Sequence, residues 1–262
     1  MGRTFVVTAG KGGVGKTTVT ANVGASLAKI GKKVVVVDMD IGLRNLDVVM
    51  GLENRVVYNI MDIIDGRCKI NQALVKDKHL NSLFLLPASQ VHTKDDIDID
   101  KVVDIISTIE GSFDYIFLDS PAGIEKGFES AVAPASEALI VATPDVSSVR
   151  DADRVIGLIE NRGVTDISLI INRYDVNMVG KKKMLDFGSV VEVLGIDLIG
   201  IIPEDKAVID STNRGEILVS YVNGSPATKA FENIARRVDG EEIPLMDFTQ
   251  SRGLFGIFRR RR

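Results

Sequence analysis

The chain has 262 residues, with one cysteine and no long apolar run. The scarcity of cysteine and the lack of a long apolar run each exclude some classes of protein. Its one cysteine, Cys68, cannot form an internal disulfide and excludes a metal or iron–sulfur site built from cysteines alone. No segment approaches the roughly 20 apolar residues of a membrane-spanning helix. Residues 4–9 read as a strand rather than as part of a signal peptide. We therefore expect a cytosolic protein.

Positive charge is concentrated near the C-terminus of the chain. The net charge is −4, but residues 251–262 contain five arginines and no acid, so residues 1–250 carry −9. An acidic body argues against binding of nucleic acid over the whole surface, and we expect no specific nucleic-acid partner. The basic C-terminal segment requires its own explanation.

The segment 10–18 reads Gly-Lys-Gly-Gly-Val-Gly-Lys-Thr-Thr and predicts a phosphate-binding loop. It lies between an apolar strand at 4–9 and a helical pattern at 17–30, the context that this motif requires and that disfavours a glycine-rich turn without a ligand. Glycines let successive backbone N–H groups turn toward one anion, and the helix directs its positive end to the same place. Lys16 would bind the outer phosphates, and the Thr17 hydroxyl would bind Mg²⁺. The predicted ATP-binding residues here are Gly10, Lys11, Gly12, Gly13, Val14, Gly15, Lys16, Thr17 and Thr18.

Strand-like and helix-like segments alternate along residues 1–238. Strands are predicted at 4–9, 33–38, 83–87, 115–119, 138–143, 167–172 and 198–202, and helices at 17–30, 100–110, 126–133, 147–161, 186–194 and 226–238. Most strands are continuously apolar, as expected when both faces of a sheet are covered. We predict one α/β domain over 1–238, a doubly wound and mainly parallel sheet with helices on both faces. Residues 239–250, which include acids and a proline, are predicted to form a tether leaving the body.

Acidic residues close two of these strands. Asp38 ends the strand at 33–38 and Asp40 follows it, and Asp119 ends the strand at 115–119. If the strands are parallel, these carboxylates stand at the same edge as the phosphate loop, where they could orient a water or bind Mg²⁺. For Asp38 and Asp40 the alternative is capping of the next segment. Asp119, with Thr17, is the predicted Mg²⁺ carboxylate.

Five segments carry a resemblance to a known family. They are the loop with Lys11, residues 38–47 (Asp-Met-Asp-Ile-Gly-Leu-Arg-Asn-Leu-Asp), 119–125 (Asp-Ser-Pro-Ala-Gly-Ile-Glu), 147–151 (Ser-Ser-Val-Arg-Asp) and 172–175 (Asn-Arg-Tyr-Asp). Over essentially its whole length the chain resembles the deviant P-loop ATPases of the ParA/MinD family, and most narrowly its septum-site-determining branch.

The resemblance implies a homodimer with two ATP molecules sandwiched between its subunits. In such a dimer Lys11 reaches the phosphates of the partner subunit, Asp40 positions the attacking water and Asp38 supports the site. It further implies that Asn172 hydrogen-bonds adenine, with Pro203, Glu204 and Asp205 beside it. Because Lys16 already serves the home site, a second lysine arriving only on dimerisation would stabilise transition-state charge and make hydrolysis depend on assembly.

The helical pattern at 147–161 is amphipathic, with charged residues opposite Val149, Ile156 and Ile159. Such a face is usually only solvated. The resemblance makes it a docking surface for a MinC-like division inhibitor and a MinE-like ATPase activator. The residues predicted to contact these partners are Arg44, Arg150, Asp151 and Asp153.

The C-terminal segment 251–262 predicts an amphipathic helix that binds a membrane surface. On a helical projection its apolar side chains fall within an arc of roughly 160°, and Arg259 and Arg260 lie outside that arc. One such helix should bind weakly to anionic lipid and two on a dimer much more strongly. The alternatives are a disordered basic tail and a segment docked on its own body. The predicted membrane-binding residues are Leu254, Phe255, Ile257, Phe258, Arg259 and Arg260.

Together with these features, the resemblance implies a Mg²⁺-dependent ATPase switch, stimulated by dimerisation, membrane and an activator. It would bind the cytoplasmic face of the cell membrane with ATP, leave after hydrolysis and place the division septum. The alternatives are a ParA-type DNA-segregation ATPase, a flagellar-placement relative, and a membrane scaffold with negligible hydrolysis.

Overall fold

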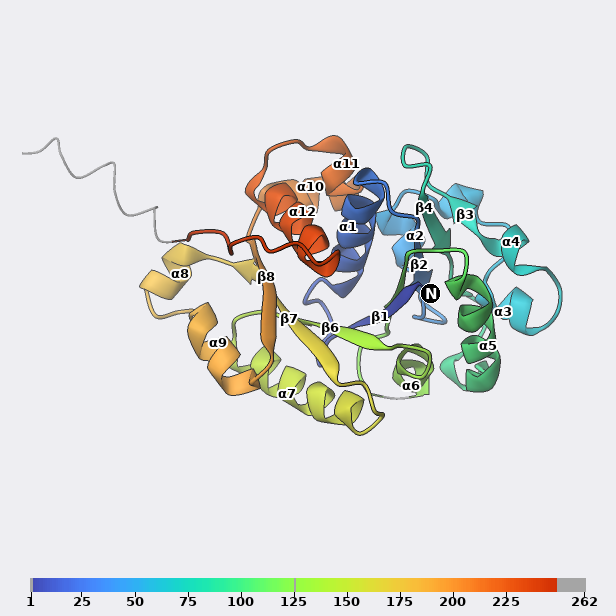
Figure 1. Ribbon diagram of the computed structural model, residues 1–262, viewed down its shortest axis with the longest axis horizontal. Coiled ribbons are helices and arrows are strands. Elements are labelled where there is room, and N and C mark those ends of the chain that lie inside the picture. Colours follow the sequence, from blue (N-terminus) through green and yellow to red (C-terminus); the bar gives the residue numbers. More distant parts are fainter. Residues whose placement is uncertain (1, 125, 249–262) are drawn as a thin grey trace, which may run out of the picture.

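The computed structural model describes residues 2–124 and 126–248, and within them one eight-stranded sheet has the order β3-β4-β2-β5-β1-β6-β7-β8. Its strands are β1 (Arg3–Thr8), β2 (Val34–Asp38), β3 (Val75–Lys76), β4 (Leu83–Leu86), β5 (Tyr115–Asp119), β6 (Glu137–Ala142), β7 (Asp166–Tyr174) and β8 (Asp197–Pro203). All neighbouring pairs are parallel except β3 and β4. The predicted doubly wound α/β fold is confirmed (Figure 1). The predicted membrane-binding residues 254–260 lie outside the described residues.

Helices cover both faces of the sheet (Figure 1). They are α1 (Lys16–Lys29), α2 (Leu46–Val49), α3 (Ile60–Ile64), α4 (Ile70–Ala73), α5 (Ile99–Glu110), α6 (Lys126–Val132), α7 (Val146–Glu160), α8 (Val176–Gly180), α9 (Phe187–Leu194), α10 (Lys206–Asn213), α11 (Leu218–Tyr221) and α12 (Pro226–Val238), with short 3-10 turns at Glu53–Arg55 and Lys94–Asp96. Of the helices in the described residues, none is both long and apolar enough to cross a bilayer.

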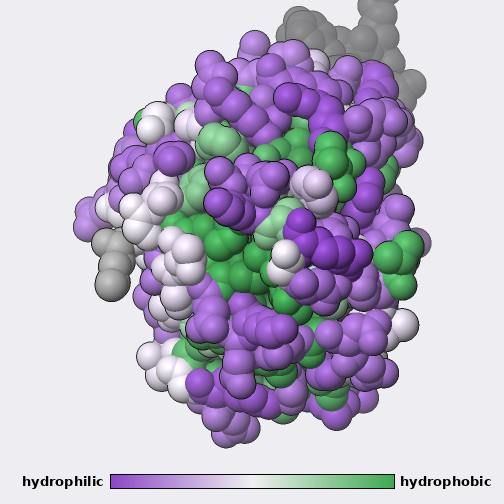
Figure 2. Space-filling model, turned by 90° about the vertical axis from the view of Figure 1, so that its right-hand side faces the viewer, coloured by the Kyte–Doolittle hydropathy of each residue, from purple (hydrophilic) through white to green (hydrophobic). Residues whose placement is uncertain are grey.

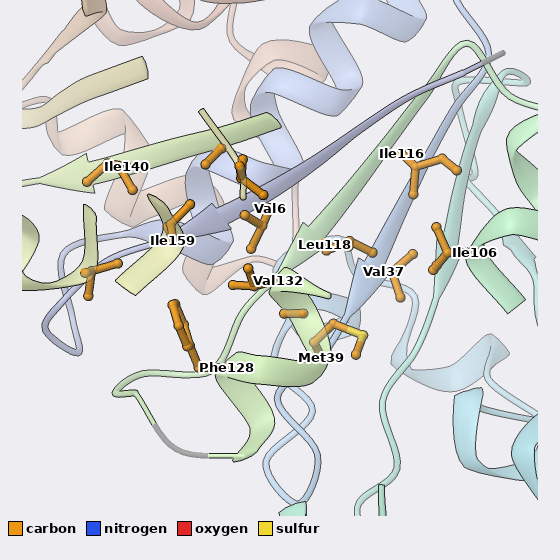
Figure 3. Close-up of a cluster of buried hydrophobic side chains, with 14 of the residues drawn as sticks. Val6, Val37, Met39, Ile106, Ile116, Leu118, Phe128, Val132, Ile140 and Ile159 are labelled. Atoms are coloured by element: carbon orange, nitrogen blue, oxygen red, sulfur yellow. The ribbon is translucent and has the colours of Figure 1, made fainter. Parts of the chain in front are cut away.

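Two apolar cores lie on opposite faces of the sheet because side chains alternate along each strand. In β2, Val34 and Val36 belong to the core that includes α1, α2, α11 and α12, whereas Val35 and Val37 belong to the core that includes α3, α5, α6, α7 and α9. Figure 3 shows the second core, where Ile106, Phe128 and Ile159 reach from three helices toward the sheet. Burial on both faces explains why the strands read as continuous apolar runs.

The predicted strands and helices are all present, but several short elements have no counterpart in the prediction. These are β3 and the helices α2, α3, α4, α8, α10 and α11, of which most have four or five residues. Segments this short complete barely one helical turn, so hydrophobic periodicity does not reveal them. The antiparallel strand β3 closes one end of the sheet, and Figure 2 shows this end with apolar side chains visible between polar ones.

The predicted tether follows the body as far as it is described. Arg237 in α12 donates hydrogen bonds to the carbonyl oxygens of Ile243, Pro244 and Ile199, at 2.8, 2.6 and 2.8 Å. Further along, the Phe248 ring lies 5.1 Å from the Tyr174 ring at the end of β7. The sequence predicted that residues 239–250 leave the body. In the structure, residues 239–248 instead stay on the body after α12, run along β8 and end near α8 (Figure 1). Hydrogen-bonded carbonyls and a partly buried aromatic contact hold them there.

Candidate nucleotide site

The predicted phosphate loop joins β1 to α1 and has the backbone conformation that anion binding requires. Gly13 and Gly15 have φ values of 78° and 97°, and Gly15 directly precedes α1. Lys16 is buried in the first turn of α1, whereas Lys11 is exposed. The loop also presses against α7, because a Cβ on Gly10 would lie 2.2 Å from backbone atoms of Asp151. Loop and helix α7 are thus in direct contact.

The carboxyl ends of β2 and β5 bring the predicted acids together next to this loop. Asp38 and Asp119 are neighbours in register. Asp119 is buried and accepts hydrogen bonds from the Thr20 hydroxyl, at 3.0 Å, and from the Thr17 hydroxyl. Burial raises the pKa of Asp119 to about 6, although the Thr17 bond and the Lys16 charge oppose this rise.

This arrangement fits Mg²⁺ bound together with a nucleotide. The Thr17 hydroxyl stands beside a buried carboxylate whose ionisation a cation would favour. Among residues 2–124 and 126–248, no cluster of three or more histidines, cysteines or acids could hold a metal ion by itself. A cation here would therefore depend on Thr17, on Asp119 and on phosphate oxygens of the nucleotide.

Asp38 and Asp40 have different surroundings. The Asp38 carboxylate is fully buried and accepts from the backbone N–H groups of Asp40, Asn45 and Leu46, at 2.9, 3.0 and 3.0 Å. Burial, reinforced by the charge of Asp119, raises the pKa of Asp38 to about 7. For Asp38 the capping alternative thus describes the structure, and its role is to shape the loop after β2.

Asp40 sits on that loop and is only half-buried. Burial raises its pKa, while the positive charges of Lys94 and Lys16 oppose the rise. The carboxylate is thus only partly accessible to solvent, and it lies close enough to the phosphate loop to feel the charge of Lys16. Its predicted role, to orient an attacking water, is compatible with this position.

Lys11 lies at the rim of a cleft beside the loop. Its Nζ donates to Ser147 Oγ at 3.0 Å, and Ser147 Oγ donates to Asp145 Oδ1 at 2.8 Å. The cleft is lined on its other side by Arg173, Asp175 and Glu204. In the single chain, Lys11 therefore points to the start of α7 rather than into its own phosphate loop.

The residues predicted to surround adenine are gathered on the β7–β8 side of the loop. Asn172, Pro203, Glu204 and Asp205 line one hollow together with Gly15 and Thr18. Asn172 Nδ2 donates to the carbonyl oxygen of Val14 at 2.7 Å. The second N–H of this amide group could still donate to adenine. A hydrogen bond from Asn172 to adenine therefore stays a prediction.

The predicted partner-binding residues fall into two groups. Arg150 and Asp153 are exposed on α7, whose opposite side is buried as predicted. Asp151 is half-buried against Gly10, and Arg44 binds Asp47 at 2.6 Å with its side chain only 17% exposed. Arg150 and Asp153 are therefore the more accessible docking candidates, and partner binding by all four residues stays a prediction.

Sequence reasoning missed three contributors to the site. Thr20 bonds Asp119, Lys94 lies near Asp40, and Asp145 accepts from Ser147 beside Lys11. Asp145 had a detectable signal, since an acid directly after a predicted strand and before a helix is a typical N-cap. Lys94 is far from the motifs in sequence, so no local pattern points to it.

Comparison with known proteins agrees with this site. The septum site-determining protein MinD of Synechocystis sp. is 53% identical over 248 residues, which cover 95% of this chain and 93% of that protein. The chain belongs to the MinD septum site-determining proteins. The model of the CobQ/CobB/MinD/ParA nucleotide binding domain also matches residues 5–219. As a member of this family the chain is a P-loop ATPase, and the ParA-type and flagellar alternatives are not favoured.

Two solved MinD structures show how closely the fold is shared. The MinC:MinD cell division protein complex of Aquifex aeolicus contains a chain 52% identical, with a TM-score of 0.87 over 94% of this chain and 98% of that one. MinD of Pyrococcus horikoshii, complexed with Mg-ADP, is 30% identical, with a TM-score of 0.82 over 91% of this chain and 96% of that one. A nucleotide with Mg²⁺ is therefore consistent with the site described above.

Proposed function

We propose that this chain is an ATP-dependent dimerising switch that places the division septum by recruiting a MinC-like inhibitor to the membrane. The observation that supports the proposal is that the two lysines of the phosphate loop occupy different environments. Lys16 is buried in its own phosphate loop, whereas Lys11 is exposed at the rim of the adjacent cleft. A cation in that place is available to the phosphates of a second subunit facing the loop.

The residues of the site divide the steps of hydrolysis among them. The loop N–H groups and Lys16 would bind the phosphates, and Asp40 would orient water toward the γ-phosphoryl group. Asp38 holds the loop that carries Asp40. Mg²⁺, held by Thr17 and Asp119, would neutralise charge on the phosphate oxygens. Lys11 from the facing subunit would complete this charge stabilisation, so that turnover requires a dimer.

Partner binding would use the exposed part of α7. Arg150 and Asp153 are solvent-exposed, and the same helix contacts the phosphate loop through Asp151 and Gly10. A change in the loop on nucleotide binding would therefore reach the docking face directly. The MinC:MinD complex of Aquifex aeolicus supports MinC as one partner, and a MinE-like activator is proposed for the same face.

Membrane attachment would depend on the basic and apolar segment 251–262. Residues 1–250 carry a net charge of −9, so the body itself would be repelled by anionic lipid. One tail supplies four large apolar side chains and five arginines, which gives weak and reversible binding. Two tails on one dimer bind more strongly through effective concentration, which would link ATP to attachment.

Co-sedimentation with anionic vesicles tests this function. Wild-type protein is expected to sediment with ATP and to stay in solution with ADP or without nucleotide. Deletion of residues 251–262 should abolish sedimentation and leave ATP binding intact. Lys11→Ala should keep nucleotide affinity but lose ATP-dependent dimerisation and stimulated turnover. Normal hydrolysis by Lys11→Ala, or sedimentation of the truncated protein, would refute the corresponding part of the proposal.

A further inference from the structure

A compact group of lysines lies in the turn between α8 and α9. Lys181, Lys182 and Lys183 are all exposed, and within the described part of the chain none of their side chains forms a hydrogen bond or ion pair. We refer to these three residues as the lysine turn. Three adjacent unpaired cations are unusual on a body whose residues 1–250 carry a net charge of −9.

The lysine turn has a defined backbone. The N–H groups of Lys181 and Lys183 donate to the carbonyl oxygen of Met178 at 3.2 and 2.9 Å, and Lys182 N donates to Val179 O at 2.9 Å. Lys182 has a positive φ of 55°. The segment that follows is held by Leu185 N, which donates to Pro144 O at 3.0 Å. The three charges are thus presented by a hydrogen-bonded turn.

The acids that flank the turn are engaged elsewhere. Asp175, before α8, accepts from the backbone N–H groups of Asn177 and Met178 at 2.8 and 3.4 Å. Asp186, before α9, accepts from the N–H and the hydroxyl of Ser189 at 3.0 and 2.7 Å. Both carboxylates cap helices, and neither pairs with a lysine of the turn. The positive charge is left for a partner outside the chain.

The position of the lysine turn indicates which kind of partner it would bind. Phe248, the last described residue, packs on Tyr174, and α8 begins two residues after Tyr174 (Figure 1). Because α8 has five residues, the turn lies within about 10 Å of the start of that helix, roughly one Debye length in moderate salt. The described chain therefore ends close to three free cations, at Phe248, and the segment predicted to bind anionic lipid follows Phe248 in the sequence.

We propose that the lysine turn is a second contact for anionic lipid headgroups, beside Phe248, the last described residue before the predicted membrane-binding segment. This inference rests on the proposed membrane attachment of the tail. Each lysine near an anionic surface contributes about fivefold in affinity (about 1 kcal/mol) at low salt. Insertion of the segment 251–262 into the bilayer would hold the lysine turn at the lipid headgroups. The lysine turn would then fix the orientation of the acidic body relative to the membrane.

The test uses full-length protein with the tail intact. The triple variant Lys181→Gln, Lys182→Gln, Lys183→Gln is compared with Lys69→Gln, Lys76→Gln, Lys78→Gln, which removes the same charge from exposed residues at the β3 end of the sheet. Binding to phosphatidylcholine vesicles with a minor fraction of phosphatidylglycerol is measured with ATP, at low and at high salt. The first variant should bind at least about tenfold more weakly at low salt, and the difference should shrink at high salt. The control variant should bind like wild type.

Three outcomes would overturn the inference. Equal loss in both triple variants would mean that only net charge matters. Loss of ATP-dependent dimerisation in solution by the first variant would place the lysines in the dimer. Wild-type binding to duplex DNA that the first variant lacks, with vesicle binding unchanged, would assign the turn to nucleic acid. Failure of wild-type protein to bind vesicles at all would instead refute the proposed function, and the inference with it.

Discussion

Replacing Asp38 with alanine should destabilise the protein, whereas replacing Asp40 should not. Asp38 is fully buried and accepts three backbone N–H groups, those of Asp40, Asn45 and Leu46. Alanine would leave these donors facing a methyl group in the loop after β2. The Asp40 carboxylate is half-buried on the same loop, and its hydrogen-bond partner there is the side chain of Asn45 rather than backbone N–H groups. The two substitutions therefore separate support of the site from the chemistry at the site.

The magnitude follows from two opposing effects. A hydrogen bond to a charged acceptor contributes about 1.5–3 kcal/mol, so the loss of three bonds is large. Against this, the folded protein bears the cost of a buried carboxylate beside Asp119, which raises the pKa of Asp38 to about 7. Removing the carboxylate removes that cost. We expect a net loss of about 2 kcal/mol for Asp38→Ala at about pH 8.

The sign of the pH dependence follows from the raised pKa. Between its unfolded value of 3.8 and its folded value of about 7, Asp38 holds a proton in the folded protein that the unfolded chain has released. Wild-type stability therefore falls as the pH rises through this window. The difference between wild type and Asp38→Ala should be about 1 kcal/mol larger at about pH 6 than at about pH 8.

Urea unfolding of nucleotide-free protein at these two pH values measures both effects, and single-turnover ATP hydrolysis measures function. Both variants should lose hydrolysis, but only Asp38→Ala should lose stability. If Asp38→Ala unfolds at the same urea concentration as wild type and still fails to hydrolyse ATP, the reasoning is refuted. Asp38 would then act on the reacting water rather than through the loop.

Three further predictions concern the phosphate loop, the Mg²⁺ site and residues 239–248. Gly10→Ala should cost at least about 1–3 kcal/mol of unfolding free energy and weaken nucleotide binding, because its Cβ would lie 2.2 Å from the backbone of Asp151. Gly12→Ala should leave stability unchanged, since its Cβ meets only Ala122 at 3.6 Å; equal losses in the two variants would contradict this packing. The Mg²⁺-dependent part of ADP affinity should fall as the pH drops below about 6, because Mg²⁺ requires ionised Asp119, and Asp119→Asn should remove that pH dependence. A fluorescent ADP titration with and without Mg²⁺ measures it, and an unchanged pH profile in the variant would count against Asp119. Finally, Arg237→Ala should speed proteolysis within 239–248, because the three carbonyls that Arg237 binds lose their donor. Unchanged cleavage relative to wild type would show that other contacts of the segment, such as those of Met246 and Phe248, hold it without Arg237.

Much of the fold was predictable because its signals are local. Continuous apolar strands alternating with helical patterns specify a doubly wound sheet, and their predicted positions agree with the structure. The phosphate loop was equally clear, since glycine positions, Lys16 and Thr17 act within one turn between β1 and α1. The short helices α2 to α4 were not predicted, because four or five residues carry too little periodicity.

Roles within the site were less predictable. Asp38 and Asp40 stand two residues apart with the same chemistry, yet the first is fully buried beneath backbone N–H groups and the second is only half-buried. Asp151 reads as a surface charge in an amphipathic helix, but it lies against Gly10 of a loop more than a hundred residues away. Contacts of this kind depend on the packing of α7 against the end of β1, which no local pattern reports.

The sequence by itself determined the class of fold, the phosphate loop and the family, because backbone freedom at glycines, strand apolarity and motif spacing are properties of neighbouring residues. The tertiary structure decided which carboxylate is buried under backbone N–H groups and which is partly exposed, where Lys11 points, and where residues 239–248 run. Arg237 binds carbonyls on β8 and on residues 243–244, and Phe248 meets Tyr174, so the described chain ends beside the lysine turn. Burial, hydrogen-bond partners and the proximity of distant charges arise only when the sheet brings separate segments together.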